Sequence, residues 1–177
     1  MKKVIMIIGL LLLVSCSTQQ EVNYDGASLK IAVIGDIPEL NNEKITFEAI
    51  TLDEFSEKNM ESTSTWNAVM ITPSIFEKAS DDFYIEMYNN SNLPIIFFDS
   101  PKRHLPFVNE DVTYQTAHWK SMDNGSHTTI YHHSYLADSE ENKEDAWYFY
   151  LKDEKNINKL YQEVFKKIED LQDQISK

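Results

Sequence analysis

The chain has 177 residues, with 29 acidic side chains against 16 basic ones and a formal net charge of −13 at pH 7. Nucleic acid and anionic membrane or wall polymers repel so acidic a chain, which argues against both as electrostatic partners. One cysteine excludes an intramolecular disulfide, and four scattered glycines leave no Gly-rich loop to cradle a phosphate.

The first sixteen residues have the pattern of an export signal. Lys2 and Lys3 precede an apolar run over residues 4–14, which is shorter than the roughly 20 residues needed to span a bilayer. A positive start, a short apolar stretch and a small residue before the break are typical of a secretory signal peptide.

The run closes on Leu13-Val14-Ser15-Cys16, which resembles the lipobox of bacterial lipoproteins. The resemblance implies that a signal peptide of residues 1–15 is removed and that Cys16 becomes a diacylated N-terminus. It therefore implies a protein attached by its lipid to the extracytoplasmic face of the cell membrane, without a polybasic segment to help. An ordinary signal peptide followed by an incidental cysteine is the alternative.

Residues 17–28 are polar, contain Gly26 and show no periodicity, which predicts that residues 16–28 are a lipidated cysteine and a flexible tether. Such a tether reaches roughly 40 Å at about 3.3 Å per residue. The remaining residues 29–177 are expected to form a single α/β domain.

The domain begins with two predicted strands. Residues 29–34 form a short apolar run typical of a buried strand, and residues 44–50 alternate like a second strand. The link between them is too short for a crossover helix, so they form either an antiparallel hairpin or a parallel pair joined by an unusual, tight loop. Thr51 and Glu54 fit a capping box that opens a short helix.

A βαβ unit is predicted next. Residues 66–72 and 95–98 are continuous apolar strands, with Val69 and Phe97 expected at their buried centres. Between them Ser74 fits the start of a second capping box, opening a helix to about residue 90. Its apolar side chains fall at helical spacing: Ile75, Phe76, Ala79, Phe83 and Met87.

An antiparallel hairpin is predicted after this unit. Asn124-Gly125 lies between strand-like runs at residues 112–122 and 127–136, and Asn-Gly favours a type I′ turn, which needs positive φ at both central positions. In that register Trp119 faces Ile130 on the buried side of the hairpin.

The chain ends with a predicted strand over residues 146–151 and a helix over residues 154–175, which Asp153 can cap. The apolar stripe of this helix comprises Ile157, Leu160, Tyr161, Val164, Phe165, Ile168 and Leu171. The predicted fold class is α/β: a mixed sheet with a central βαβ unit, an antiparallel hairpin extension and a C-terminal amphipathic helix.

The first candidate ligand-binding site lies at the carboxyl ends of the predicted strands, where open α/β sheets bind their ligands. Asp36 and Asp99 follow two of these strands, and Ser74, Ser100 and His104 lie just beyond strand ends. Two carboxylates near basic residues suit a polar ligand. The alternative is that Ser74 caps a helix and the others stand in turns.

The second candidate is an interaction face on the predicted hairpin. His118, Tyr131 and His133 would lie together on its outward face, where aromatic and histidine side chains supply contact area. The alternative is that the tyrosines of this face lie beneath the last helix. No metal site is expected, because only His118 and His133 come within about 7 Å and no carboxylate converges on them.

These features predict a cell-envelope lipoprotein that acts as a non-catalytic binding or interaction module. It would need no cofactor, and its partner beyond the membrane would be a protein or a small molecule. The alternative is a small-ligand receptor or hydrolase-type enzyme that uses the crevice around Asp36 and Asp99. A convergent pocket with perturbed carboxylates would favour this alternative.

Overall fold

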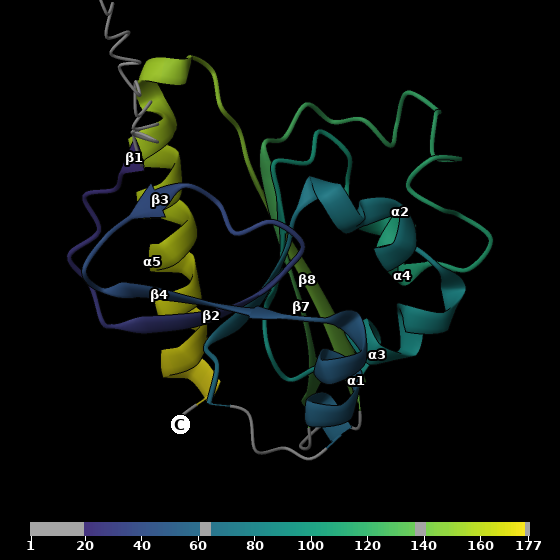
Figure 1. The fold of residues 1–177 in the computed structure, drawn as a ribbon. Helices are drawn as coiled ribbons and strands as arrows, with labels where there is room; N and C mark the ends of the chain where they lie inside the picture. Colours follow the sequence, from purple (N-terminus) through teal and green to yellow (C-terminus); the bar gives the residue numbers. More distant parts are fainter. Residues whose placement is uncertain (1–19, 61–64, 137–140, 176–177) are drawn as a thin grey trace, which may run out of the picture.

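The computed structural model describes residues 20–60, 65–136 and 141–175, so the leader and Cys16 lie outside the described part (Figure 1). A six-stranded mixed sheet has the order β4-β2-β5-β6-β7-β8. Its strands are β2 (Leu29–Ile34), β4 (Ile45–Ile50), β5 (Ala68–Ile71), β6 (Ile95–Phe98), β7 (Thr128–Leu136) and β8 (Glu141–Phe149). The first four strands in this order are parallel, and β7 and β8 add an antiparallel hairpin. The predicted fold class is confirmed.

Helices cover both faces of this sheet. The short helices α1 (Leu52–Met60), α2 (Phe76–Ala79), α3 (Ile85–Asn89) and α4 (Leu105–Val108) lie on one face, and α5 (Ile157–Ile175) lies across the other (Figure 1). No helix in residues 20–60, 65–136 and 141–175 is long and apolar enough to cross a membrane.

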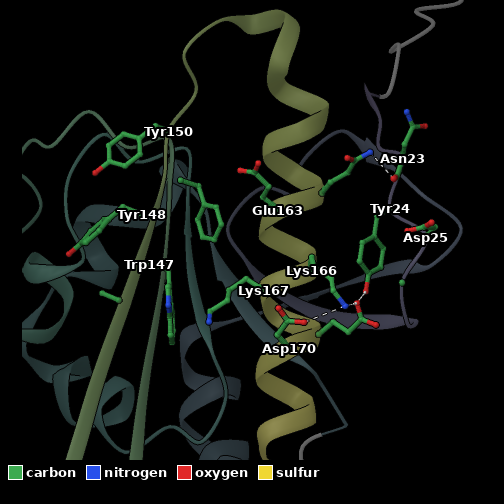
Figure 2. A pocket seen from close by; sticks show the side chains of 15 residues that line it. Asn23, Tyr24, Asp25, Trp147, Tyr148, Tyr150, Glu163, Lys166, Lys167 and Asp170 are labelled. Atoms are coloured by element: carbon green, nitrogen blue, oxygen red, sulfur yellow. Dashed lines mark hydrogen bonds and ion pairs between the residues drawn. The ribbon is translucent and has the colours of Figure 1, made fainter.

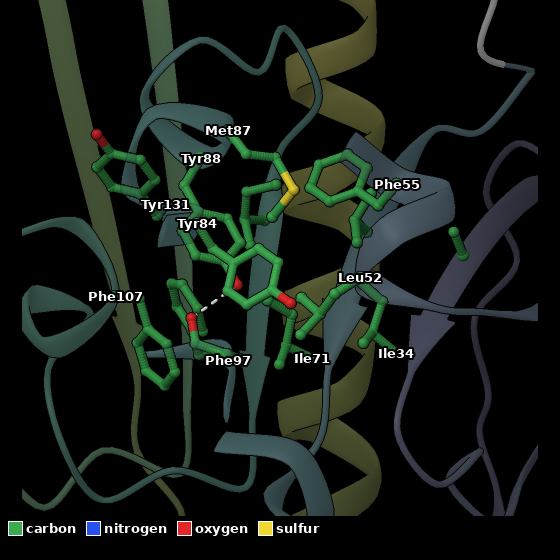
Figure 3. Close-up of a cluster of buried hydrophobic side chains, with 14 of the residues drawn as sticks. Ile34, Leu52, Phe55, Ile71, Tyr84, Met87, Tyr88, Phe97, Phe107 and Tyr131 are labelled. Carbon is green, nitrogen blue, oxygen red and sulfur yellow. Dashed lines mark hydrogen bonds between the residues drawn. The ribbon is translucent and has the colours of Figure 1, made fainter. Parts of the chain in front are cut away.

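Each face of the sheet has its own core because successive strand residues point to opposite sides. On the α1–α4 side, Ile71 and Phe97 pack with aromatic residues such as Tyr88 and Phe107 (Figure 3). On the α5 side, Met70 and Ile96 pack against the helix stripe. Burying one such side chain stabilises the fold by about 1.5–3 kcal/mol.

The βαβ prediction is confirmed at its centre. β5 and β6 are parallel neighbours in the middle of the sheet, and Val69 and Phe97 are 0% exposed. The Thr51 capping box also forms: the backbone N–H of Glu54 donates to Thr51 Oγ1 at 3.1 Å, and Thr51 N–H donates to Glu54 Oε2 at 2.7 Å. At the other end of the chain the carboxylate of Asp153 accepts a hydrogen bond from Lys155 N–H, as a cap should.

β2 and β4 are parallel, so the antiparallel alternative is wrong and the unusual loop is confirmed. Leu29 pairs with Ile45, and residues 35–44 return along the sheet without a helix. The return begins at Gly35, whose φ of +102° few other residues adopt. Within it β3 (Leu40–Asn41) pairs with β1 (Gln20–Glu21) in a separate two-stranded parallel sheet.

The predicted helix over residues 74–90 is broken into short turns. Asp81 interrupts it, because its carboxylate accepts a hydrogen bond from Phe83 N–H and starts a new turn, Asp82–Tyr84. Phe83, expected on the buried face, is therefore 77% exposed. Ser74 makes no helix cap, and its hydroxyl oxygen instead accepts the N–H of Asp36 at 3.1 Å.

The predicted Asn124-Gly125 hairpin is wrong. Gly125 has a φ of +69°, but the non-glycine residues with positive φ in the described part are Asp99 and Asp111, so Asn124 lacks the φ of a type I′ turn. The Asp123 and Asn124 side chains accept N–H bonds from Gly125 and Ser126, and they shape a loop. Both edges of β7 are occupied, by β6 and β8, so residues 112–122 have no edge to join.

The predicted tether is also wrong for the part that the structure describes. Residues 20–28, which we call the N-terminal strap, run along α5 and bury Val22 and Tyr24 in the core. Tyr24 lies edge-on against Phe165 with ring centroids 5.8 Å apart. Two apolar side chains spaced for burial in a short polar segment were the signal for this packing.

Candidate functional site

A groove with a cavity volume of about 850 Å³ lies along α5 (Figure 2). Its lining comes from residues 23–26 of the N-terminal strap, from residues 146–150 at the end of β8, and from the α5 side chains between Gln162 and Asp170. Three segments from both ends of the chain therefore build one site, which the sequence-based candidates did not include.

The aromatic wall of the groove follows from the position of β8 at the edge of the sheet. Trp147 pairs with Ile130 and Phe149 with Thr128, so both side chains lie on the α5 side. Since α5 crosses the middle of the sheet, it leaves these outer side chains half-buried. Tyr148, between them, lies on the opposite face and bonds His104 there.

Lysine side chains flank this wall. The ammonium of Lys167 lies 3.8 Å from the centroid of the Trp147 ring, a cation–π contact. Lys166 turns to the acidic side of the groove and bonds Glu169 at 2.9 Å and Asp170 at 3.3 Å. These hydrogen bonds raise the pKa of Lys166 and, with Lys166 as the largest cause, lower the pKa of Glu169.

Tyr24 joins the strap to the acidic side of the groove. Its hydroxyl donates to the carbonyl of Ala27 at 3.0 Å and lies 3.3 Å from Glu169 Oε2. Burial, followed by the charge of Glu169, raises the pKa of Tyr24 to about 12, so it stays a neutral donor. Among the lining residues the four carboxylates of Asp25, Glu163, Glu169 and Asp170 outnumber the two lysines.

The outer edge of β8 is open within the described residues: β7 is its single strand neighbour in the sheet. Exposed edges usually carry charges that prevent pairing with other chains. The first half of β8 follows this rule with Lys143, Glu144 and Asp145, but the second half, residues 146–149, is apolar and aromatic.

The strand-end candidates Asp36 and Asp99 have separate contacts. Asp36 is exposed and contacts Ser74 through its backbone. Asp99, at a φ of +54°, lies 3.6 Å from His127 Nε2. Burial lowers the pKa of His127 more than the charge of Asp99 raises it, so the imidazole is neutral at pH 7.

Ser100 and His104 instead fasten the loop that follows β6. Ser100 is fully buried, with its hydroxyl 3.2 Å from both the Lys102 carbonyl and the Tyr114 hydroxyl. His104 stacks on Tyr131, and its Nδ1 lies 3.0 Å from the Tyr148 hydroxyl. Burial, with a smaller contribution from the charge of Arg103, lowers the pKa of His104 to about 4. These contacts are structural.

The predicted interaction face does not exist as one surface. Trp119 is 47% exposed, whereas Tyr131 is 0% exposed and donates its hydroxyl hydrogen to Asn89 Oδ1 at 2.8 Å. His118 is exposed in a loop, and His133 is half-buried on β7. The expected register would have needed residues 112–122 to be a strand, and they form turns.

In the part of the chain that the structure describes, no group of three His, Cys, Asp or Glu side chains is arranged to hold a metal ion. Comparisons of the chain with models of known protein families, with curated proteins and with solved structures find no match. The fold and the groove define this protein as an α/β domain with an open strand edge beside an aromatic and charged groove.

The groove had one signal in the sequence. Residues 146–150, Ala-Trp-Tyr-Phe-Tyr, place aromatic side chains on both faces of a strand. On an interior strand both faces are buried, but on an edge strand part of this aromatic surface remains uncovered. The sequence alone did not say that this strand would be at the edge.

Proposed function

We propose that this protein is a lipoprotein attached through Cys16 to the extracytoplasmic face of the cell membrane, where its domain binds an extended polypeptide segment. The segment would add to the open edge of β8, with alternate side chains in the groove beside α5. This mode supplies main-chain hydrogen bonds for affinity and side-chain pockets for selectivity.

The observation that carries the proposal is the composition of β8 along its length. Charged side chains of residues 143–145 protect the first half of the edge. Residues 146–149 lack this protection and adjoin a cavity of about 850 Å³. An unprotected aromatic edge beside a groove is costly unless it has a binding partner.

Charge limits the partner to a neutral or basic segment. The chain carries a net charge of −13, and carboxylates outnumber lysines in the groove lining. A sugar ring would stack on a free aromatic face, but Lys167 covers a face of Trp147. A polypeptide fits better, because it uses the strand edge as well as the groove.

A peptide-display selection against the soluble form that starts at Ser17 tests the binding mode. We expect enrichment of peptides with apolar or aromatic residues at alternate positions and with Lys or Arg between them. Trp147→Ala should weaken binding of these peptides by about 10-fold or more, as loss of an aromatic anchor does. Phe83→Ala, which removes an exposed aromatic on the opposite side of the sheet, should leave binding unchanged.

Two results would contradict the binding site: no enrichment over an unrelated acidic protein, or equal binding by the Trp147→Ala and wild-type proteins. Melting curves of both variants show whether a loss of binding reflects unfolding. The anchor is tested separately: metabolic labelling with a fatty acid should mark the wild type and not Cys16→Ser.

The alternative, a receptor or enzyme that uses the strand-end crevice, has weaker support. Asp36 and Asp99 contact different partners, and neither lines the groove beside α5.

A further inference from the structure

The N-terminal strap bears directly on where the domain stands relative to a membrane. Its first residues are hydrogen-bonded to the return loop, residues 35–44 between β2 and β4. Gln20 N–H donates to the Glu39 carbonyl at 2.7 Å, and Val22 N–H donates to the Asn41 carbonyl at 3.0 Å. The side chain of Asn42 then bonds the carbonyls of Val22 and Tyr24 at 2.6 and 2.8 Å.

The strap is also fixed to α5 from its first turn onward. Asn158 donates to the Glu21 carbonyl at 2.9 Å and accepts the Asn23 N–H at 3.0 Å. Further along, Gln162 donates to the Asn23 carbonyl at 2.7 Å. Backbone and side-chain bonds together therefore fix the chain at Gln20, at the N-terminal end of α5.

This leaves a short connection between the domain and a lipid on Cys16. Four peptide units separate Cys16 from Gln20, and at about 3.3–3.6 Å per residue they span at most about 14 Å. A tether of 40 Å would let the domain turn freely, but one of about 14 Å keeps the attached end close to the bilayer.

The orientation follows from this short connection and not from charge. The lysines at this end are Lys152, Lys155 and Lys159, and they are balanced by Asp153, Glu154 and Glu21. Lys159 also pairs with Glu163 at 3.7 Å.

We infer that the domain stands on the membrane in one orientation, with the strap start and the N-terminal turn of α5 against the lipid headgroups. The opposite end of α5, near Asp173, points away from the bilayer. This inference rests on the proposed lipid attachment at Cys16. It deepens the proposed function, because the groove then runs away from the membrane and its far end is open to partners.

A quenching experiment on the full-length, lipidated protein tests the orientation. Lys155→Cys and Asp173→Cys, both at exposed positions, each receive a fluorophore. Their labelling is specific because the thiol of Cys16, the single native cysteine, would carry the lipid. Lys155 lies just before α5, and the helix alone rises about 24 Å from Ile157 to Asp173 at 1.5 Å per residue.

The proteins are placed on vesicles of phosphatidylcholine and phosphatidylglycerol that contain a lipid with a nitroxide on its headgroup. We expect several-fold stronger quenching at Lys155→Cys than at Asp173→Cys. A matched variant with a Gly-Ser segment of about twelve residues inserted between Gln19 and Gln20 should lose most of this difference, because a flexible linker of that length removes the restraint.

Failure of the anchor and failure of the orientation give different results. If Cys16→Ser sediments with the vesicles as well as the wild type does, the lipid attachment is wrong and the inference falls with it. If the wild type alone sediments but both positions quench equally, the anchor stands and the orientation is overturned. A difference that survives the insertion also overturns it, because the short connection would not be its cause.

Discussion

The ammonium of Lys167 on α5 lies 3.8 Å from the ring centroid of Trp147 on β8, and this contact joins the last helix to the edge strand across the groove. Lys166, its neighbour in the chain, forms ion pairs with Glu169 and Asp170 on the side of the helix that faces away from Trp147. Adjacent lysines therefore have different partners, and this gives a matched pair for measurement.

The first prediction concerns this contact. A double-mutant cycle of Lys167→Ala and Trp147→Ala should give a coupling of about 0.5–1 kcal/mol in the free energy of unfolding, the range of exposed cation–π pairs. The same cycle with Lys166→Ala should give a coupling near zero. Equal couplings for the two lysines, measured by urea unfolding, would mean that the helix face is assigned incorrectly.

The second prediction concerns the centre of the sheet. Phe97→Ala should lower the free energy of unfolding by about 3–5 kcal/mol, because it leaves a cavity among Tyr88, Phe107 and their neighbours. Phe83→Ala, at a residue that is 77% exposed, should change it by less than about 0.5 kcal/mol. Similar losses for the two variants in chemical denaturation would contradict the assigned burial.

The third prediction uses the low pKa of His104, about 4 in the folded protein against 6.5 as its ordinary value. Between these values the unfolded chain takes up a proton that the folded chain refuses, so stability falls as the pH drops from about 6.5 to about 4. At 1.36 kcal/mol per pKa unit, this loss is on the order of 3 kcal/mol.

His104→Gln should remove most of that dependence, because a glutamine does not titrate. The measurement is the free energy of unfolding of both proteins at pH 7.5 and pH 4.5. A pH dependence as steep in the variant as in the wild type would assign the effect to other groups.

The fourth prediction compares two glycines with positive φ. A Cβ at Gly35 would collide with Thr72 and Ser74, whereas at Gly125 it would meet nothing within 4 Å. Gly125→Ala should cost about 1–2 kcal/mol for its backbone conformation alone. Gly35→Ala should cost about 1–3 kcal/mol more, through crowding at the start of the return loop. Thermal melting ranks the two, and a smaller loss at Gly35 would contradict this account of the loop.

Elements with strong local signals were predictable from the sequence. Hydrophobic periodicity located the stripe of α5 and the strands that contain Val69 and Phe97. The Thr51 capping box formed because its bonds join residues three positions apart. Where a competing local bond intervened, as at Asp81, the same reasoning failed and predicted one continuous helix.

The hairpin failed for a different reason. Asn124-Gly125 favours a turn wherever it occurs, but a turn forms a hairpin only if the flanking segments pair with each other. Residues 128–136 pair with β6 and β8 instead, which buries Tyr131 and leaves Trp119 in solvent. Hydrogen-bonding edges are limited, and competition for them is settled by the whole sheet.

The sequence by itself thus determined the α/β class, the two central strands, the amphipathic last helix and the lipobox-like start that predicts a lipid anchor. The tertiary structure alone decided that β8 is an edge strand, that α5 leaves Trp147 half-covered, and that residues 20–28 pack on the domain. Local elements follow from bonds and periodicity among near neighbours in the chain. The groove and the strap depend on which distant segments bury one another's surfaces, and no short stretch of sequence contains that information.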